Sequence, residues 1–130
     1  ESEEGQVWEA AMFAAHHKLD RIIAVTDWNG QQIDGPVSKI MNLGNLEAKW
    51  NAFGWETSVV DGHNLEAIAE AYRKAKANSG NGKPKMLLMK TEMGQDVDFM
   101  QGTHQWHGKA PNKEQTEVAL KQLKETLGDF

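Results

Sequence analysis

The sequence predicts an α/β fold in which a parallel sheet carries helices on both faces. Short apolar runs at residues 22–25 and 86–89 have the length of buried strands, and residues 57–60 are predicted as a further short strand. Helical patterns separate them, so strands and helices alternate along the chain. Such alternation needs right-handed crossover connections, which place helices over the faces of a parallel sheet. A length of 130 residues fits a single domain, spanning 1–130.

The first helix is predicted over residues 4–18, because apolar side chains recur there at the three-and-four spacing of a buried helical face. Those side chains are Val7, Trp8, Ala11, Met12, Ala15 and Leu19. Residues 21–26 form the first strand, and the unbroken apolar run within it suits a strand covered on both faces. A loop is expected over residues 27–44.

Asparagines mark the starts of the later helices. Asn45 can cap a helix over 46–53, Asn64 one over 65–78, and Asn112 with Gln115 resembles a capping box for a last helix over 113–127. The apolar stripe of the second of these helices comprises Leu65, Ile68, Ala69, Tyr72 and Ala75. Gly54 supplies a left-handed stop before the second strand. Residues 91–110 form a segment too long for an ordinary connection unless it is functional.

Charge and composition exclude several classes of function. Fourteen Lys and Arg against nineteen Asp and Glu give a net charge of -5, which disfavours a nucleic-acid partner or an anionic membrane surface. The absence of Cys excludes disulfides, thiolate nucleophiles and Cys-ligated zinc. The apolar runs are far shorter than the roughly 20 residues of a membrane-spanning helix. We therefore expect a soluble, cytoplasmic protein.

The segment 27–35 is rich in oxygen ligands and follows the first strand. An EF-hand interpretation fails, because Gln32 and Ser38 stand where that loop needs Gly and Glu. A Mg²⁺ that bridges the protein to a diphosphate needs fewer protein ligands, and the Asn29 side chain and the Gln31 backbone carbonyl could supply them. Alternatively, Asn-Gly and Asp-Gly are simply turn formers. From this loop alone, the turn interpretation is preferred.

Histidine and glutamate residues elsewhere in the sequence also permit both a functional and a structural interpretation. His104 and His107 could bind a metal, but too few further ligands are evident for zinc, and hydrogen bonding to a phosphate or a substrate hydroxyl is more economical. Glu4 and Glu9 lie about 140° apart around the first helix, so they do not form a local pair, and from the residues alone they are interpreted as a solvated acidic flank.

Several motifs occur in sequence over nearly the whole chain. They are Glu4-Gly5-Gln6-Val7-Trp8-Glu9-Ala10-Ala11, residues 16–19, Asp27-Trp28-Asn29-Gly30-Gln31-Gln32-Ile33-Asp34-Gly35, Gly54-Trp55, Asp61-Gly62-His63, Lys90-Thr91 with Gly94, Gly102-Thr103-His104 and His107-Gly108. Together, and in this order, they resemble the thiamine-diphosphate-binding domain of the transketolase family.

The resemblance implies a cofactor site. It implies that the Asn29 side chain and the Gln31 carbonyl bind the Mg²⁺ or Ca²⁺ ion that holds thiamine diphosphate. It also implies that Ile33 and Met93 pack against the thiazolium ring, and that His107 hydrogen-bonds the diphosphate and faces the substrate channel. Glu4 and Glu9 are similar to members of a carboxylate network that links paired active sites across a dimer, where buried like charges titrate as a unit.

The implied activity is that of a transketolase, which transfers a two-carbon ketol unit from a ketose phosphate to an aldose phosphate. The cofactor carries the bond chemistry, and the protein supplies position and charge. The implied partners are sugar phosphates and a C-terminal subunit or domain, in a homo- or hetero-oligomer. That partner would supply the Glu that activates the cofactor's aminopyrimidine.

Departures from the family pattern indicate a fragment. In the family, Gly-Asp-Gly precedes a segment similar to residues 1–5, and that motif's Asp is absent here. Lys109 stands between His107-Gly108 and Ala110-Pro111 where many members have no extra residue, and the sequence ends at Phe130, as in two-subunit transketolases. The alternatives are a non-catalytic binding or assembly module and a related thiamine-diphosphate-dependent synthase.

Overall fold

The computed structural model describes residues 1–124 and divides into two compact units. Unit 1 comprises residues 1–29 and 41–91, and unit 2 comprises residues 30–40 together with the described chain from 92 onward. The expectation of a single domain over 1–130 stays a prediction. Within residues 1–124, no helix combines the length and the apolar character needed to cross a bilayer.

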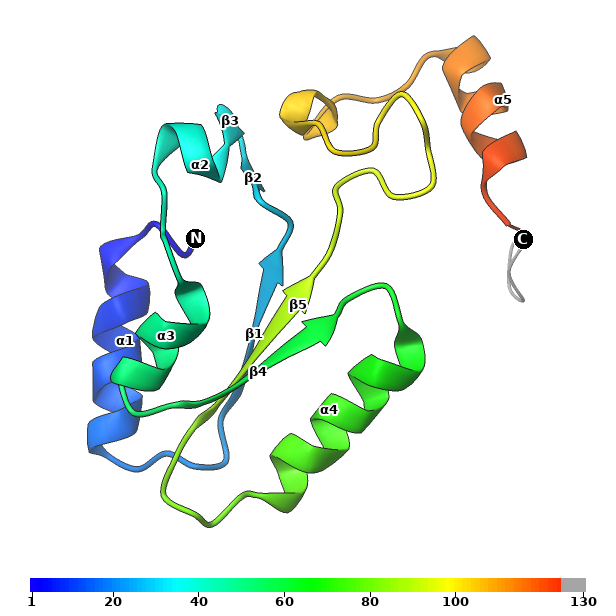
Figure 1. Ribbon diagram of the computed structural model, residues 1–130. Helices are drawn as coiled ribbons and strands as arrows, with labels where there is room; N and C mark the ends of the chain where they lie inside the picture. Colours follow the sequence, from blue (N-terminus) through cyan, green and yellow to red (C-terminus); the bar gives the residue numbers. More distant parts are fainter. Residues whose placement is uncertain (125–130) are drawn as a thin grey trace. The chain divides into compact units, whose positions relative to one another are not determined.

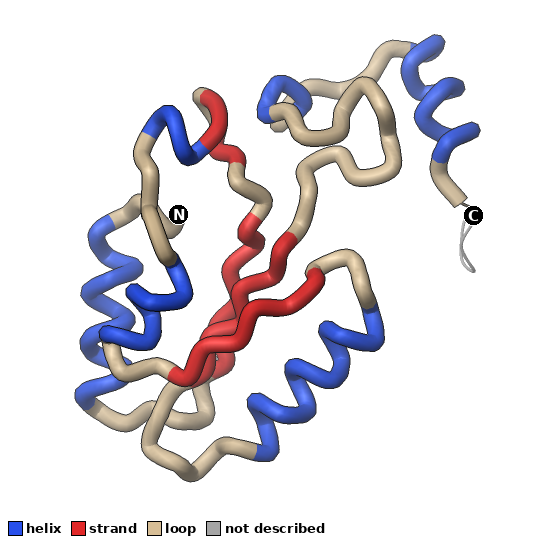
Figure 2. The backbone as a smooth tube through the Cα atoms, viewed as in Figure 1, coloured by secondary structure: helices blue, strands red, loops and turns tan. Residues whose placement is uncertain are grey.

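Unit 1 is built on a parallel sheet of three strands, β1 (Ile23–Trp28), β4 (Glu56–Asp61) and β5 (Lys85–Lys90) (Figure 2). The strand order is β1-β5-β4, so the last strand in the sequence lies in the centre. Helices α1 (Gly5–His16) and α3 (Leu46–Ala52) cover one face, and α4 (Leu65–Ala77) covers the other (Figure 1). This arrangement confirms the predicted fold class.

The central strand β5 divides its side chains between two cores. Met86 and Leu88 pack with Ala11, Trp50 and other residues of α1 and α3, whereas Leu87 and Met89 pack with residues of α4. Alternation of side chains along a strand produces this division. Because β5 has a neighbouring strand on each side and helices on both faces, it is the most completely buried strand.

The edge strand β1 is less covered than expected. Ile22 is 39% exposed and Val25 is 46% exposed, so the prediction of a strand buried on both faces is wrong here. The physical reason is that β1 is an edge strand within residues 1–124, where it pairs with β5 on one side and with no strand on the other. An uninterrupted apolar run identified a strand in a parallel sheet, but it did not distinguish an edge strand from the central one.

The helix starts agree with the sequence more closely than the buried helix faces do. Side-chain oxygens of Asn45, Asn64 and Asn112 accept hydrogen bonds from the first turns of α3, α4 and α5 (Lys113–Gln122), and Asn112 forms the predicted capping box with Gln115. The end predicted for the last helix, residue 127, lies outside the described residues.

Two predicted apolar stripes are only partly buried, although Val7, Trp8, Ala11 and Ala15 of α1 pack in the core as expected. The side chains expected to be buried but found at least 38% exposed include Met12, Leu19, Leu65 and Tyr72. On α4, the predicted Ile68 and Ala75 do pack against the sheet, and Ala67 and Ala71 pack there beside them. Small alanine side chains let the helix approach the sheet, so the larger apolar residues at the margin remain outside.

Unit 2 contains short elements that were expected to be loop. Residues 27–44 include β2 (Gln31–Gln32), β3 (Gly35–Pro36) and α2 (Val37–Ile40), and β2 and β3 pair as an antiparallel hairpin. The segment after β5 adds the 3-10 turn η1 (His104–Trp106) and the helix α5. Pairs of two-residue strands are stabilised by their partner and leave no periodic pattern in the sequence.

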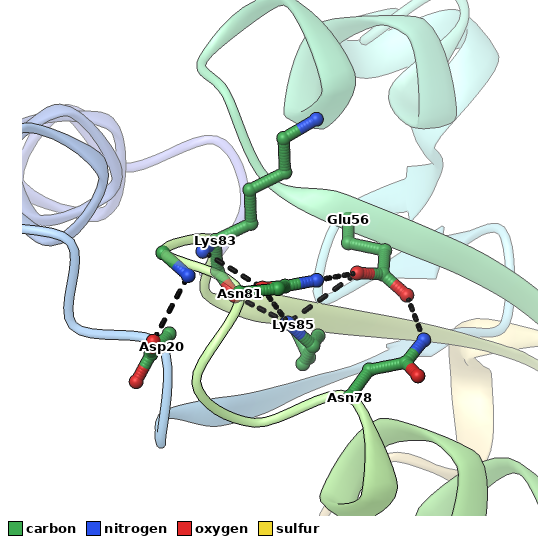
Figure 3. Close-up of polar contacts among 7 residues, drawn as sticks. Asp20, Glu56, Asn78, Asn81, Lys83 and Lys85 are labelled. Atoms are coloured by element: carbon green, nitrogen blue, oxygen red, sulfur yellow. Dashed lines mark hydrogen bonds and ion pairs between the residues drawn. The ribbon is translucent and has the colours of Figure 1, made fainter.

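A buried lysine closes the amino edge of the unit 1 sheet (Figure 3). Lys85, at the start of β5, is 2% exposed, and its ammonium lies 2.7 Å from the Asn81 side-chain oxygen and 3.3 Å from a Glu56 carboxylate oxygen. Glu56 also accepts hydrogen bonds of 2.7 Å from the Asn78 and Asn81 amides. The charges are thus satisfied within the fold, and this cluster joins β4 to the turn between α4 and β5.

Candidate functional site

The carboxyl edge of the unit 1 sheet carries the polar residues that the sequence singled out. Strands β1 and β5 are parallel neighbours, with Trp28 opposite Lys90, so the segments that follow them leave the sheet at the same edge. Asp61, at the end of β4, is also opposite Lys90. Ligands of parallel sheets bind at this edge, which makes it the candidate site.

Three polar side chains are connected at this edge. The Asn29 amide nitrogen donates to Asp27 Oδ2 at 3.1 Å, and the Thr91 hydroxyl donates to Asp27 Oδ1. The Lys90 ammonium lies 5.4 Å from the centre of the Trp28 ring, a cation–π contact between the ends of the same two strands. Asp27 therefore links the segment after β1 to the segment after β5.

Gly62 allows the end of β4 to approach the same cluster. Its N–H donates to the Lys90 carbonyl at 2.8 Å. A Cβ atom at this position would overlap Thr91 Cγ2 and would lie 2.9 Å from the Lys90 carbonyl oxygen. Only a residue without a side chain fits here without a shift of its neighbours, so Gly62 permits the close approach of Thr91.

In unit 2, the β2–β3 hairpin directs the Gln31 carbonyl outward. The Val37 N–H donates to the Gly30 carbonyl at 2.9 Å, so Gln31 and Pro36 form a non-hydrogen-bonded pair within the ladder. The N–H and C=O groups of such a pair point away from the partner strand. The Gln31 side chain donates from Nε2 to the Gly102 carbonyl at 3.3 Å, which fixes the hairpin against the segment after β5.

That segment folds into a compact loop around Met93 and Gly94. The Gly102 N–H donates to the Met93 carbonyl at 2.8 Å and closes the loop. Gly94 has a φ of +70°, and a Cβ atom there would lie 2.5 Å from the Met100 carbonyl carbon. Met93 is half-buried, and Ile33, just after β2, is 72% exposed. Both residues predicted to pack against the thiazolium ring, Ile33 and Met93, belong to unit 2.

His107 ends the turn η1, which tryptophan contacts hold in place. The His107 N–H donates to the His104 carbonyl at 3.0 Å, and Trp106 Nε1 donates to the Phe99 carbonyl at 2.7 Å. The Trp106 ring also contacts the ring of Phe99, with centroids 5.1 Å apart. The His107 side chain remains exposed on this anchored turn.

Glu4 and Glu9 lie in the first part of α1. Glu4 is the residue before the helix, and its backbone carbonyl accepts from the Val7 N–H at 3.2 Å, while its side chain makes no capping hydrogen bond. Both glutamates are exposed in this chain. Their membership of a carboxylate network between active sites stays a prediction.

The predicted site residues are divided between the units. Asn29 and Glu4 belong to unit 1, whereas Gln31, Ile33, Met93 and His107 belong to unit 2. In the described residues 1–124, no group of three or more His, Asp or Glu side chains is arranged to hold a metal ion. The candidate metal ligands thus remain the amide of Asn29 and the carbonyl of Gln31, and their convergence on one ion stays a prediction.

Asp27 and Thr91, at the carboxyl edge, belong to the sequence motifs, but the sequence alone predicted no role for them. Asp27 precedes Asn29 by two positions, and Thr91 follows β5, but nothing local predicts that their side chains meet across 64 positions of sequence. The available signal was indirect: both residues lie where strands of the predicted parallel sheet end.

Comparisons with known proteins agree with the motifs. The family model "Transketolase, thiamine diphosphate binding domain" matches residues 2–129. A 6-deoxy-6-sulfo-D-fructose transketolase subunit of a Clostridium species is 44% identical over 95% of this chain, and an apulose-4-phosphate transketolase subunit of Phocaeicola vulgatus is 35% identical over 98%. The chain spans 44% of the length of each of these relatives.

Solved structures agree as well. The transketolase of Campylobacter jejuni superimposes with a TM-score of 0.81 and 32% sequence identity, covering 92% of this chain and 18% of that one. The transketolase of Leishmania mexicana gives a TM-score of 0.73 at 25% identity, again over 92% of this chain, which covers 21% of that structure. These matches confirm the resemblance read from the sequence motifs: the chain belongs to the transketolase family, as a thiamine-diphosphate-binding domain.

Proposed function

We propose that this chain supplies the diphosphate-binding half of a transketolase that moves a two-carbon ketol unit from a ketose phosphate to an aldose phosphate. Thiamine diphosphate and a divalent cation, Mg²⁺ or Ca²⁺, are the proposed cofactors. A C-terminal domain or subunit completes the active site in a homo- or hetero-oligomer. The observation that carries the proposal is the set of oxygen ligands directly after β1.

That ligand set fits a hard cation. The Asn29 amide is held by its nitrogen at Asp27, and the Gln31 carbonyl points out of the β2–β3 hairpin. The two residues are separated by one residue, Gly30, so the chain keeps them close. Neutral oxygens of this kind suit Mg²⁺ or Ca²⁺, which completes its coordination with phosphate and water oxygens.

The remaining site residues would bind and orient the cofactor. Exposed Ile33 and half-buried Met93 offer apolar surface to the thiazolium ring, and the His107 imidazole can hydrogen-bond a diphosphate oxygen or a substrate hydroxyl. Bound thiamine diphosphate supplies the capacity to break and form the carbon–carbon bond. The chain itself supplies position and charge, and Glu4 is proposed to join a shared carboxylate network at the interface.

The substrate is proposed to be an anionic sugar, with sugar phosphates preferred. One relative is named for 6-deoxy-6-sulfo-D-fructose and another for apulose 4-phosphate, so members differ in the sugar that they use. A panel of ketose phosphates and one sulfonated ketose, each offered to the complete enzyme with a common aldose phosphate, tests this step. Turnover of the sulfonated ketose alone would overturn the phosphate preference and leave the reaction class unchanged.

Calorimetry with thiamine diphosphate and Mg²⁺ tests the cofactor assignment in the complete enzyme. Asn29→Ala should weaken Mg²⁺-dependent cofactor binding, because it removes a metal ligand. Asn51→Ala, on the exposed surface of α3, is the matched control and should bind as the unsubstituted protein does. Equal affinities for the two variants would remove Asn29 from the site.

Turnover of a His107→Ala variant tests the second half of the site. The rate should fall while the fold, followed by circular dichroism, stays intact, because His107 lies exposed at the end of an anchored turn. Kinetics equal to those of the unsubstituted enzyme would exclude this residue. If this chain assembled with its partner domain or subunit but the assembly never bound the cofactor, the chain would be an assembly module instead.

A further inference from the structure

The Asp27 carboxylate accepts hydrogen bonds from two different segments of unit 1. One oxygen, Oδ2, accepts from the Asn29 amide nitrogen at 3.1 Å, and the other, Oδ1, accepts from the Thr91 hydroxyl. Asp27 belongs to β1, and Thr91 follows the neighbouring strand β5. Both donors are therefore brought to the carboxylate by the pairing of these two strands.

A carboxylate at this position determines which end of the Asn29 amide faces it. The two oxygens of a carboxylate accept hydrogen bonds and donate none, whereas a side-chain amide has one donating end and one accepting end. If the Asn29 amide were reversed, its oxygen would meet the Asp27 oxygen and the hydrogen bond would be lost. The nitrogen of Asn29 is thus kept at Asp27, and its oxygen is kept as the end that can bind a cation.

We propose that Asp27 is a positioning residue for the metal site: it orients Asn29 so that the amide oxygen is presented to the cation, and Thr91 locks Asp27 in place. This proposal rests on the proposed function, because it needs Asn29 to be a metal ligand. It assigns to Asp27 and Thr91 a role that acts through Asn29 and requires no contact with cofactor or substrate.

Thr91 and Gly62 explain why the carboxylate has one orientation. Asp27 is exposed, so its side chain would be able to rotate if only Asn29 held it. The Thr91 hydroxyl holds the second oxygen, and Thr91 itself packs against Gly62, where no Cβ atom fits. The ends of all three strands thereby contribute to the orientation of a single amide. Partners of this kind, placed behind a metal ligand, tune metal affinity.

The test uses the complete enzyme and measures the apparent Mg²⁺ affinity at a fixed concentration of thiamine diphosphate, by calorimetry. Asp27→Ala should weaken Mg²⁺ binding by about 10- to 100-fold, as is typical when the partner of a metal ligand is removed. Excess Mg²⁺ should restore cofactor binding. Asp27→Asn keeps an acceptor but permits both amide orientations, so a smaller loss of about twofold to fivefold is expected.

Thr91 offers a matched pair of variants. Thr91→Val has nearly the same shape but no hydroxyl, and it should weaken Mg²⁺ binding by a few-fold. Thr91→Ser keeps the hydroxyl and should retain the affinity. Thermal unfolding of each variant without cofactor separates the proposal from a purely structural role. An equal drop in midpoint for both Thr91 variants, with Mg²⁺ affinity tracking that drop, would overturn it.

A double variant tests whether Asp27 affects Mg²⁺ affinity through Asn29. If Asp27 acts through Asn29, then Asp27→Ala should have no further effect on Mg²⁺ affinity once Asn29→Ala is present. Additive losses would overturn the proposal, as would an Asp27→Ala enzyme with unchanged Mg²⁺ affinity. An unsubstituted enzyme without Mg²⁺-dependent cofactor binding would overturn the proposed function as well, whereas failure of the Asp27 variants alone leaves it intact.

Discussion

The polar clusters at the two edges of the unit 1 sheet differ in burial. At the amino edge, Lys85 is 2% exposed, and its ammonium is held by Glu56, Asn81 and the Lys83 carbonyl. At the carboxyl edge, Asp27 is exposed and Asn29 is half-buried, although hydrogen bonds connect Asp27 to both Asn29 and Thr91. Burial therefore distinguishes the amino-edge cluster, whose polar groups are satisfied within the fold, from the carboxyl-edge cluster, whose exposed groups are those proposed to meet a ligand.

Removal of the amino-edge charge should have the largest effect on stability. Glu56→Gln leaves the buried Lys85 ammonium without its counter-charge, and breaking such a pair costs about 3 kcal/mol of unfolding free energy, the low end for buried pairs because Glu56 is 35% exposed. Chemical denaturation measures this change. Mg²⁺-dependent cofactor affinity at the opposite edge should be unaffected in the folded protein.

The same substitution on the surface is the control. Glu70 pairs with Arg73 on α4, with side chains 47% and 69% exposed, so Glu70→Gln should cost less than about 0.5 kcal/mol. Equal losses at Glu56 and Glu70 would mean that the buried position of Lys85 contributes nothing special. The contrast between the two sheet edges would then have no energetic basis.

A methyl group at Gly62 should disturb the carboxyl edge with a somewhat smaller effect. The added Cβ of Gly62→Ala would overlap Thr91 Cγ2 and crowd the Lys90 carbonyl, which should cost about 1–3 kcal/mol. Because Thr91 must move, Mg²⁺ affinity should fall as well. Thermal unfolding and calorimetry measure the two effects.

Gly5→Ala provides the matched comparison for Gly62→Ala. Gly5 is the first residue of α1, and a Cβ atom there meets nothing within 4 Å. Stability should stay the same or rise slightly, since Ala favours helix more than Gly does. A Gly62→Ala protein as stable as Gly5→Ala, with unchanged Mg²⁺ affinity, would show that the strand ends tolerate displacement of Thr91.

Features set by residues close together in the sequence were predicted more accurately than features set by distant residues. The caps of Asn45, Asn64 and Asn112 depend on neighbours three positions away and were predictable. The parallel sheet followed from the alternation of apolar runs and helices. By contrast, β2 and β3 exist only because they pair, and a Pro at position 36 argues against a strand in any local reading.

The polar clusters at the two edges were unpredictable for a related reason. Lys85 follows a turn and looks like a solvated boundary residue, yet residues from β4 and from the turn after α4 bury it. Asp27 and Thr91 meet because β1 and β5 are adjacent, and the sequence predicts a parallel sheet but not this strand order. The motifs located the candidate site residues, whereas strand order determined which side chains hold Asn29.

The smallest predicted effect is the pH dependence of the amino edge. Hydrogen bonding from the Asn78 side chain is the main cause that lowers the pKa of Glu56 below its usual 4.5; Asn81 and Lys85 act in the same direction, and burial opposes them. A carboxyl whose pKa is lower in the folded state stabilises the fold above the unfolded value, and this contribution is lost as the pH falls through the folded value.

The difference in unfolding free energy between the unsubstituted protein and Glu56→Gln should therefore be constant at neutral pH and shrink as the pH falls below about 4.5. Denaturation curves of both proteins between about pH 7 and pH 3 measure it, and the subtraction cancels the other carboxylates. Glu70→Gln, which removes a carboxylate from an exposed pair, serves as the control measured over the same pH range. A difference that stayed constant to pH 3 would mean that the Glu56 charge does not stabilise Lys85, and that hydrogen bonding alone holds the amino edge.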